Sequence, residues 1–120
     1  MDLPPYSPGL HKLVTLHVDE ISKLTNSSGF VAVTNSILEK YELEKVGVVV
    51  HDFENESFTI SFCLRGSHIC IHTQPQYKQL TLDVYLSNYF QDNSQRVRDV
   101  VTDYITYFNA EIIKDFEINR

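Results

Sequence analysis

Apolar and polar residues alternate along the middle of the chain, and this pattern predicts three consecutive β-strands. Over residues 57–64, apolar side chains occupy every second position, with hydroxyls and a thiol between them. The same period of two returns over 67–72 and over 80–87. Because successive strand side chains point to opposite faces, each strand has one apolar and one polar face. The polar residues of the middle strand are predicted to share one face: Ser67, His68, Cys70 and His72.

Two other segments have the apolar spacing of helices. The first begins at a capping residue, Asn26, Ser27 or Ser28, and extends to Tyr41. The second covers residues 94–109 and carries one continuous apolar stripe. We expect these two helices to cover the apolar face of the sheet together.

Three more strands complete the pattern. Residues 11–18 and 112–118 are predicted to form the first and the last strand. Residues 46–52 are β-branched and nearly continuous, which is typical of a strand buried on both faces. A turn centred on Asn55 then reverses the chain and predicts a hairpin.

The element order β-α-β-β-β-β-α-β predicts an α+β fold. We expect a two-layer α/β sandwich with a mainly antiparallel sheet, two helices on one face, and the polar face left open. Residues 1–9 are predicted to be an N-terminal tail and residues 10–120 a single domain. The open face is expected to serve dimerisation, ligand binding or both.

Charge and composition exclude several partners. The chain has 16 acidic and 10 basic residues, a formal charge of −6 and no basic cluster, so a nucleic acid or an anionic membrane is not expected as a partner. No apolar run is long enough to span a bilayer and no secretory signal opens the chain, which predicts a cytoplasmic protein. Cys63 and Cys70 form no CxxC motif and are predicted to be reduced thiols.

The polar residues around Ser67 do not match the common catalytic or metal motifs. Alternate positions of one strand, such as His68, Cys70 and His72, offer at most two ligands comfortably, so no metal is predicted. Ser67 and His68 are neighbours in a strand and there is no Gly-x-Ser-x-Gly elbow, which argues against a serine hydrolase.

A longer motif through the same strand resembles a known family. The run Ser67-His68-x-x-x-His72-Thr73-x-Pro75, with Asp83 eight residues later, is similar to the signature of the bacterial and archaeal S-adenosylmethionine decarboxylases. Weaker similarity covers residues 9–11 and 50–53. The resemblance implies a pyruvoyl-dependent decarboxylase that acts in polyamine (spermidine) biosynthesis.

The resemblance also implies how the cofactor forms. The Ser67 hydroxyl would attack the carbonyl of Gly66, and β-elimination from the resulting ester would cut the chain and leave a pyruvoyl group derived from Ser67. Its ketone would form a Schiff base with the substrate amine and accept the electrons released with carbon dioxide. His72 matches the family's processing histidine, and Thr59 falls where the family has a processing serine.

Three positions depart from the family pattern. Gly66 replaces the glutamate that precedes the processed serine, and Gln76 replaces a glutamate that contacts the nucleoside ribose of the substrate. Ser87 stands at the position of the cysteine that donates a proton to the substrate, and a serine hydroxyl is a far poorer acid than a thiol. Cys70 or Tyr85 could supply that proton instead.

Two hypotheses about function follow. The first is a self-processing decarboxylase of adenosylmethionine or another amino acid, working as a homodimer that pairs its open sheet faces. The second is an unprocessed, catalytically inactive homologue that acts as a dimeric binding or regulatory protein. The changes at Gly66, Gln76 and Ser87 motivate the second hypothesis.

Overall fold

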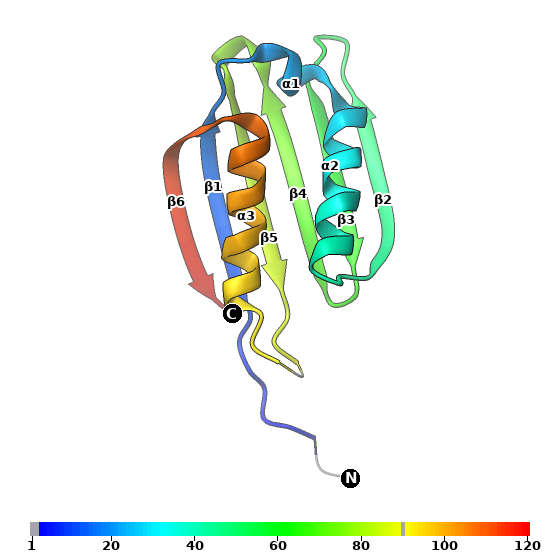
Figure 1. Ribbon diagram of the computed structural model, residues 1–120, viewed down its shortest axis with the longest axis vertical. Coiled ribbons are helices and arrows are strands. Elements are labelled where there is room, and N and C mark those ends of the chain that lie inside the picture. The colour runs from blue at the N-terminus through cyan, green and yellow to red at the C-terminus, as the bar shows by residue number, and fades with distance from the viewer. Residues whose placement is uncertain (1–2, 90) are drawn as a thin grey trace.

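A computed structural model describes residues 3–89 and 91–120, so Met1, Asp2 and Phe90 lie outside the described residues, the first two of them within the predicted tail. In the described part, helices cover one face of a six-stranded antiparallel sheet (Figure 1). The strands run in the order β2-β3-β4-β5-β1-β6 across the sheet. They are β1 (Leu10–His17), β2 (Lys45–Asp52), β3 (Phe58–Leu64), β4 (Ser67–Gln74), β5 (Gln79–Leu86) and β6 (Glu111–Asn119).

The helices are α1 (Ile21–Thr25), α2 (Ser27–Lys40) and α3 (Ser94–Phe108), with a 3₁₀ turn, η1 (Pro75–Tyr77), between β4 and β5. The predicted α+β sandwich and the order of its strands and two main helices are confirmed. The sequence pattern did not predict α1 or η1, because each is too short to show a periodicity. None of the described helices is long and apolar enough to cross a membrane.

The main helices begin and end at residues suited to those positions. Asn26 caps α2, because its side-chain oxygen accepts a hydrogen bond from the Gly29 amide at 2.9 Å. Asn109 ends α3 in the left-handed conformation with φ 48°, which asparagine tolerates better than most residues. Both boundaries lie within one or two residues of the predicted ones.

The core lies between the helices and the apolar face of the sheet. The rings of Phe30 and Tyr104 stack with centroids 5.1 Å apart and join α2 to α3. The Tyr104 hydroxyl shares a 2.7 Å hydrogen bond with Thr34, which satisfies both buried polar groups. The alternating strand residues that point into this core are buried as predicted: Phe58, Ile60, Phe62, Leu64, Ile69, Ile71, Leu80, Leu82, Val84 and Leu86.

The prediction that residues 46–52 form a buried strand is wrong. They form β2, which lies at one edge of the sheet, where Val46 is 66% and Val49 is 71% exposed. An apolar β-branched run is also compatible with an edge strand, because strand propensity does not report position within the sheet. The opposite edge, β6, likewise exposes apolar side chains: Ile112, Ile113, Phe116 and Ile118.

The open face of the sheet also differs from the prediction in two respects. His68, Cys70 and His72 share this face, whereas Ser67 alternates with them and belongs to the helix-covered face. The open face is not purely polar, because Leu13 of β1 and Phe116 of β6 pair across it.

The two ends of the sheet carry different groups (Figure 1). We call one the η1 end; it holds the β2–β3 turn and η1. We call the other the Gly66 end; it holds the β3–β4 turn, the beginning of β1 and the end of β6.

Candidate functional site

Gly66 forms the β3–β4 turn in a conformation that favours glycine. Its φ is +68°, in the left-handed region that side-chain-bearing residues adopt at a cost. A Cβ added there would lie 3.2 Å from the Ser87 hydroxyl oxygen. The departure at Gly66 therefore suits both the turn and its tight contact with Ser87.

Ser67 begins β4 beside the end of β5. Its Oγ accepts a hydrogen bond from the Ser87 backbone amide at 3.1 Å. The structure thus brings together Gly66, Ser67 and Ser87, the three positions that the resemblance assigns to cleavage and proton donation. The hydroxyl is half-buried and next in sequence to the Gly66 carbonyl that it would attack.

A cavity of about 360 Å³ opens at this end of the sheet. Its lining comes from four regions of the chain: Tyr6, Gly66, Ser67, His68, Tyr85 and Arg120. Tyr6, from the predicted tail, donates a hydrogen bond to the Arg120 carbonyl at 2.6 Å. Burial, together with the Tyr6 hydroxyl, raises the pKa of Tyr85, so this phenol stays protonated near neutrality.

Two histidines converge on one carboxylate beside this cavity. His68 Nε2 lies 2.9 Å and His11 Nε2 lies 3.1 Å from the same oxygen, Asp83 Oδ1. Arg120 approaches His11 from the other side, with Nη1 3.3 Å from Nδ1. The sequence pattern missed this cluster, because His11 meets β5 only through a strand pairing that joins distant parts of the chain.

The same cluster has the residue types of a metal site, but its hydrogen bonds do not suit one. The ligand atoms of His11, His68 and Asp83 lie within 4.8 Å of one another. A guanidinium group can only donate hydrogen bonds, so Nδ1 of His11 accepts from Arg120 and Nε2 carries the ring proton. That nitrogen then has no lone pair for a metal ion.

The two residues predicted to act in processing meet at the η1 end. Thr59 and His72 are cross-strand partners, and Thr59 Oγ1 lies 2.9 Å from His72 Nδ1. This bond orients the imidazole on the open face, where His72 is exposed. Gln76 is exposed nearby on η1. Gln74 Oε1 is buried and has no hydrogen-bond partner among the described residues, which leaves an acceptor at this end.

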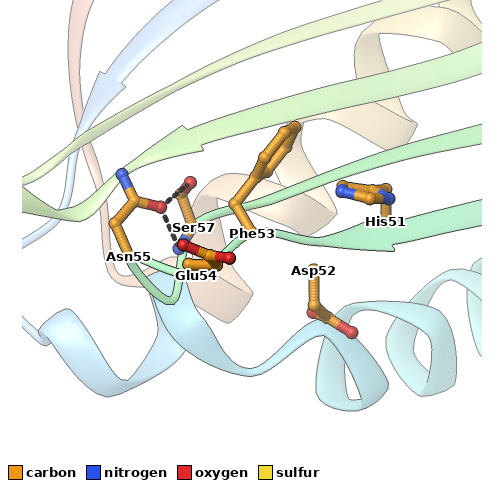
Figure 2. Close-up of a pocket in the computed structure, with 6 residues that line it drawn as sticks. All are labelled: His51, Asp52, Phe53, Glu54, Asn55 and Ser57. Atoms are coloured by element: carbon orange, nitrogen blue, oxygen red, sulfur yellow. Dashed lines mark hydrogen bonds between the residues drawn. The ribbon is translucent and has the colours of Figure 1, made fainter.

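A second hollow lies at the β2–β3 turn (Figure 2). It measures about 730 Å³ and is lined by one continuous segment: His51, Asp52, Phe53, Glu54, Asn55 and Ser57. The Phe53 ring is 48% exposed and stands edge-on to His51, with centroids 4.5 Å apart. Asn55 accepts hydrogen bonds from the amide and hydroxyl of Ser57 and so fixes the turn. Phe53 belongs to the segment 50–53 that resembles the family, but the sequence predicted no site role for it.

The site residues at the Gly66 end are far from those at the η1 end within one chain. Ser67 and His72 are five residues apart on β4, which corresponds to about 16 Å along an extended strand. They also belong to opposite faces of the sheet. Thr59 and His72 therefore do not reach Ser67 of their own chain.

The two alternative proton donors are placed differently. Tyr85 lines the cavity at Ser67. Cys70 does not line it, and its thiol instead lies 3.3 Å from Ser61 Oγ on the open face. Burial raises the pKa of Cys70, which makes it a weaker acid. Cys63 and Cys70 are both free thiols.

Comparisons with known proteins point to one family. The family model of S-adenosylmethionine decarboxylase matches residues 11–120. The S-adenosylmethionine decarboxylase proenzyme of Archaeoglobus fulgidus is 22% identical over 112 residues, which cover 93% of this chain and 96% of that protein. The corresponding proenzyme of a Sulfurihydrogenibium species is 30% identical over 77 residues, covering 64% of this chain and 58% of that protein.

A solved structure extends the similarity to three dimensions. The crystal structure of the adenosylmethionine decarboxylase from Aquifex aeolicus superposes with a TM-score of 0.83 at 25% sequence identity. The match covers 96% of this chain and 92% of that one. Fold and sequence similarity therefore extend over nearly the whole chain.

Proposed function

The chain belongs to the S-adenosylmethionine decarboxylase family, and from this premise we propose that it is a self-processing, pyruvoyl-dependent decarboxylase of adenosylmethionine in polyamine biosynthesis. The observation that carries the proposal is the contact at the Gly66 end. There the Ser67 hydroxyl is held by the Ser87 amide beside a turn with no side chain at position 66. The proenzyme names of two relatives support cleavage of this chain as well.

The residues at the Gly66 end fit the formation of a pyruvoyl group. Ser67 borders a cavity of about 360 Å³, which gives space for the group and for part of a substrate. When formed, the group supplies a ketone that condenses with an amine and accepts the electrons released with carbon dioxide. Tyr85 lines the cavity as a protonated phenol and is positioned to donate a hydrogen bond there, although its raised pKa makes it a weak acid.

The distance between Ser67 and the Thr59–His72 pair supports a homodimer in which each site contains residues of both copies. If two copies pack their open faces about a two-fold axis, with their strands running in opposite directions, the η1 end of one copy lies over the Gly66 end of the other. The second copy then supplies the Thr59–His72 pair to the first copy's Ser67. The exposed apolar side chains on and beside the open face, Val49 and Phe116 among them, favour burial against another copy.

In such a dimer the residues of the η1 end contribute to substrate binding. The exposed ring of Phe53 offers a surface on which a purine can stack. Gln76 can hydrogen-bond to ribose hydroxyls as a neutral amide in place of the family's carboxylate. Adenosylmethionine carries both a purine and a ribose, so these groups suit that substrate.

The proposal is tested by intact mass spectrometry of the purified protein. We expect two pieces of 66 and 54 residues, split between Gly66 and Ser67, and release of labelled carbon dioxide from carboxyl-labelled adenosylmethionine. A single 120-residue chain that persists under all conditions would favour the unprocessed binding or regulatory protein instead. Cleavage with carbon dioxide release from ornithine or arginine alone would retain the enzyme and change its substrate.

The sharing of sites is tested by co-expression of two variants. Neither Ser67→Ala nor His72→Ala is expected to cleave alone, whereas co-expression should allow cleavage of the His72→Ala chain by His72 of the other copy. The control partner is Ser67→Ala/His72→Ala, with which no cleavage is expected. Absence of cleavage in both mixtures, with mixed dimers present, would show that each chain processes itself.

A further inference from the structure

Arg120 brings a positive charge to the cavity beside Ser67. Among the described residues that line this cavity, Arg120 is the only one with a permanent charge. The chain as a whole is acidic, with a formal charge of −6. Even so, the Arg120 guanidinium makes no ion pair with a carboxylate of residues 3–89 or 91–120. This cation is therefore available to an anionic group of a ligand.

Two contacts hold the Arg120 guanidinium in place. Its Nη1 lies 3.3 Å from His11 Nδ1, which accepts the hydrogen bond. Its central carbon stands over the Tyr85 ring, 5.9 Å from the ring centroid. A guanidinium has five N–H donors, and the bond to His11 uses one of them. Because residue 120 is exposed, a ligand in the cavity can reach the other donors.

The backbone of Arg120 is anchored to the N-terminal tail. Its amide donates to the Gly9 carbonyl and its carbonyl accepts from the Gly9 amide, each at 3.0 Å. The Tyr6 hydroxyl donates to the same Arg120 carbonyl at 2.6 Å. Gly9 crosses the end of β5 so closely that a Cβ there would lie 2.5 Å from the Leu86 carbonyl oxygen. The tail therefore holds the base of the Arg120 side chain beside the cavity.

Arg120 and Ser67 border the same cavity from different strands. Tyr85, the residue beneath the guanidinium, is the cross-strand partner of His68, which follows Ser67 on β4. Neighbouring strands lie about 5 Å apart, so the guanidinium stands over the strand next to the start of β4. The cavity of about 360 Å³ that both residues line has room for the amino-acid part of a substrate.

We propose that Arg120 binds the carboxylate of the substrate in this cavity and so selects α-amino acids over the corresponding amines. A guanidinium binds a carboxylate through two parallel hydrogen bonds, which suits the donors that the His11 contact leaves unused. This inference rests on the proposed function, and it gives a role to a residue to which the resemblance assigned none. It applies to adenosylmethionine and to other amino acids alike, because all of them carry this carboxylate.

Such a contact stabilises the bound substrate more than the transition state. The carboxylate loses its negative charge as carbon dioxide leaves, so its attraction to the guanidinium weakens along the reaction. Removing the guanidinium should therefore raise KM and leave kcat nearly unchanged. The decarboxylated product has no carboxylate, so Arg120 does not retain it in the cavity.

The first test compares the steady-state kinetics of the wild type and Arg120→Met with adenosylmethionine. We expect KM to rise by about 10-fold or more, while kcat per mole of cleaved chain changes by less than about 3-fold. Arg120→Lys should give an intermediate KM, because lysine keeps the charge but cannot form the paired hydrogen bonds. The matched control is Arg65→Met, whose KM should equal that of the wild type. Arg65 lies in the same turn as Gly66, but it pairs with Glu44 at 3.2 Å and does not line the cavity.

The second test requires neither cleavage nor turnover. In the uncleaved Ser67→Ala chain, isothermal titration calorimetry measures the binding of adenosylmethionine and of its decarboxylated form. We expect adenosylmethionine to bind about 10-fold more tightly, and Arg120→Met to remove this preference by weakening only the ligand with the carboxylate. Ornithine with putrescine, and arginine with agmatine, repeat the comparison for the other substrates.

The outcomes separate this inference from the proposed function. A wild-type chain that never cleaves contradicts the proposed function, whereas a carboxylate preference that Arg120→Met removes still supports the Arg120 site. A cleaving wild type with the same KM in Arg120→Met overturns only the role of Arg120. A fall in kcat at unchanged KM overturns it as well, because Arg120 would then act in the reaction instead of in binding. Equal affinity for both members of every ligand pair, or binding of none, contradicts a carboxylate site.

Discussion

The backbone of Ser87 has a structural role, whereas its side chain is a poor acid. Its backbone amide holds the Ser67 hydroxyl, and any residue at position 87 except proline can supply that contact. Its side chain is a hydroxyl where the family has a thiol, and an unactivated hydroxyl hardly donates a proton near neutrality. In the proposed reaction, position 87 therefore holds the Ser67 hydroxyl through its backbone and lacks a thiol that could donate a proton during turnover.

Restoring the thiol should raise turnover without changing processing. We expect Ser87→Cys to increase carbon dioxide release from adenosylmethionine by about 10-fold or more, because general acids contribute about 10²- to 10⁴-fold to such steps. The rate of chain cleavage should stay the same. Ser61→Cys is the control, since Ser61 lies on the open face outside the cavity. An unchanged turnover in Ser87→Cys would mean that another group, such as Tyr85, already supplies the proton.

The turn at Gly66 should be sensitive to any side chain. In a Ser67→Ala background, which prevents cleavage, we expect Gly66→Ala to lower the free energy of unfolding by about 1–2 kcal/mol, the cost of a left-handed conformation for an L-residue. Urea unfolding followed by circular dichroism measures it. Gly47→Ala is the matched control, because a Cβ there meets nothing within 4 Å. Equal stability of the two variants would contradict the strain assigned to position 66.

At the scale of elements, β1, β6 and α3 are joined by charged groups on the helix-covered face. Lys12 of β1 is buried and lies 3.0 Å from Glu117 of β6, which also pairs with Arg98 of α3 at 3.1 Å. Hydrogen bonds from Arg98 and then Lys12 lower the pKa of Glu117 from 4.5 to about 2. The network holds the edge strand β6, whose own side chains are exposed throughout.

This network predicts an acid-dependent loss of stability. Because the pKa of Glu117 is lower in the folded chain, its contribution is complete above about pH 4.5 and is lost as the pH falls toward 2. We expect Glu117→Gln to be less stable than the parent chain at pH 7, with the difference shrinking between pH 4.5 and 2. Thermal unfolding across this range measures it, in the Ser67→Ala background. Glu54→Gln, at an exposed turn, should show a pH dependence like that of the parent.

The sequence predicted features that depend on neighbouring residues better than features that depend on contacts between distant parts of the chain. Local signals placed the cap of the first long helix within residues 26–28, where Asn26 provides it, and located the Asn55 turn and the alternation in β3, β4 and β5 correctly. The burial of β2 was predicted wrongly, because its place at the sheet edge depends on long-range pairing. The convergence of His11 and Asp83 was missed for the same reason, since 72 residues separate them in the chain.

For the molecule as a whole, the distance between the two halves of the site is the main constraint. The family resemblance assigned Ser67, Thr59 and His72 to one reaction. The structure holds Thr59 and His72 together at the η1 end and Ser67 at the Gly66 end, so only an arrangement with a second copy can unite them.

A substitution at Phe116 tests the dimer. If the dimer is lost, processing should stop as well. Phe116 is 58% exposed and pairs with Leu13 on the open face, so a lysine there would place a charge in the proposed interface. We expect Phe116→Lys to give a monomer by size exclusion with light scattering, and an uncleaved chain by mass spectrometry. Ile112→Lys is the control, because Ile112 is on the same edge strand but pairs with the buried Leu16 of the helix-covered face. A monomeric Phe116→Lys that still cleaves would mean that Ser67 needs no second copy. A dimer that persists would place the interface elsewhere.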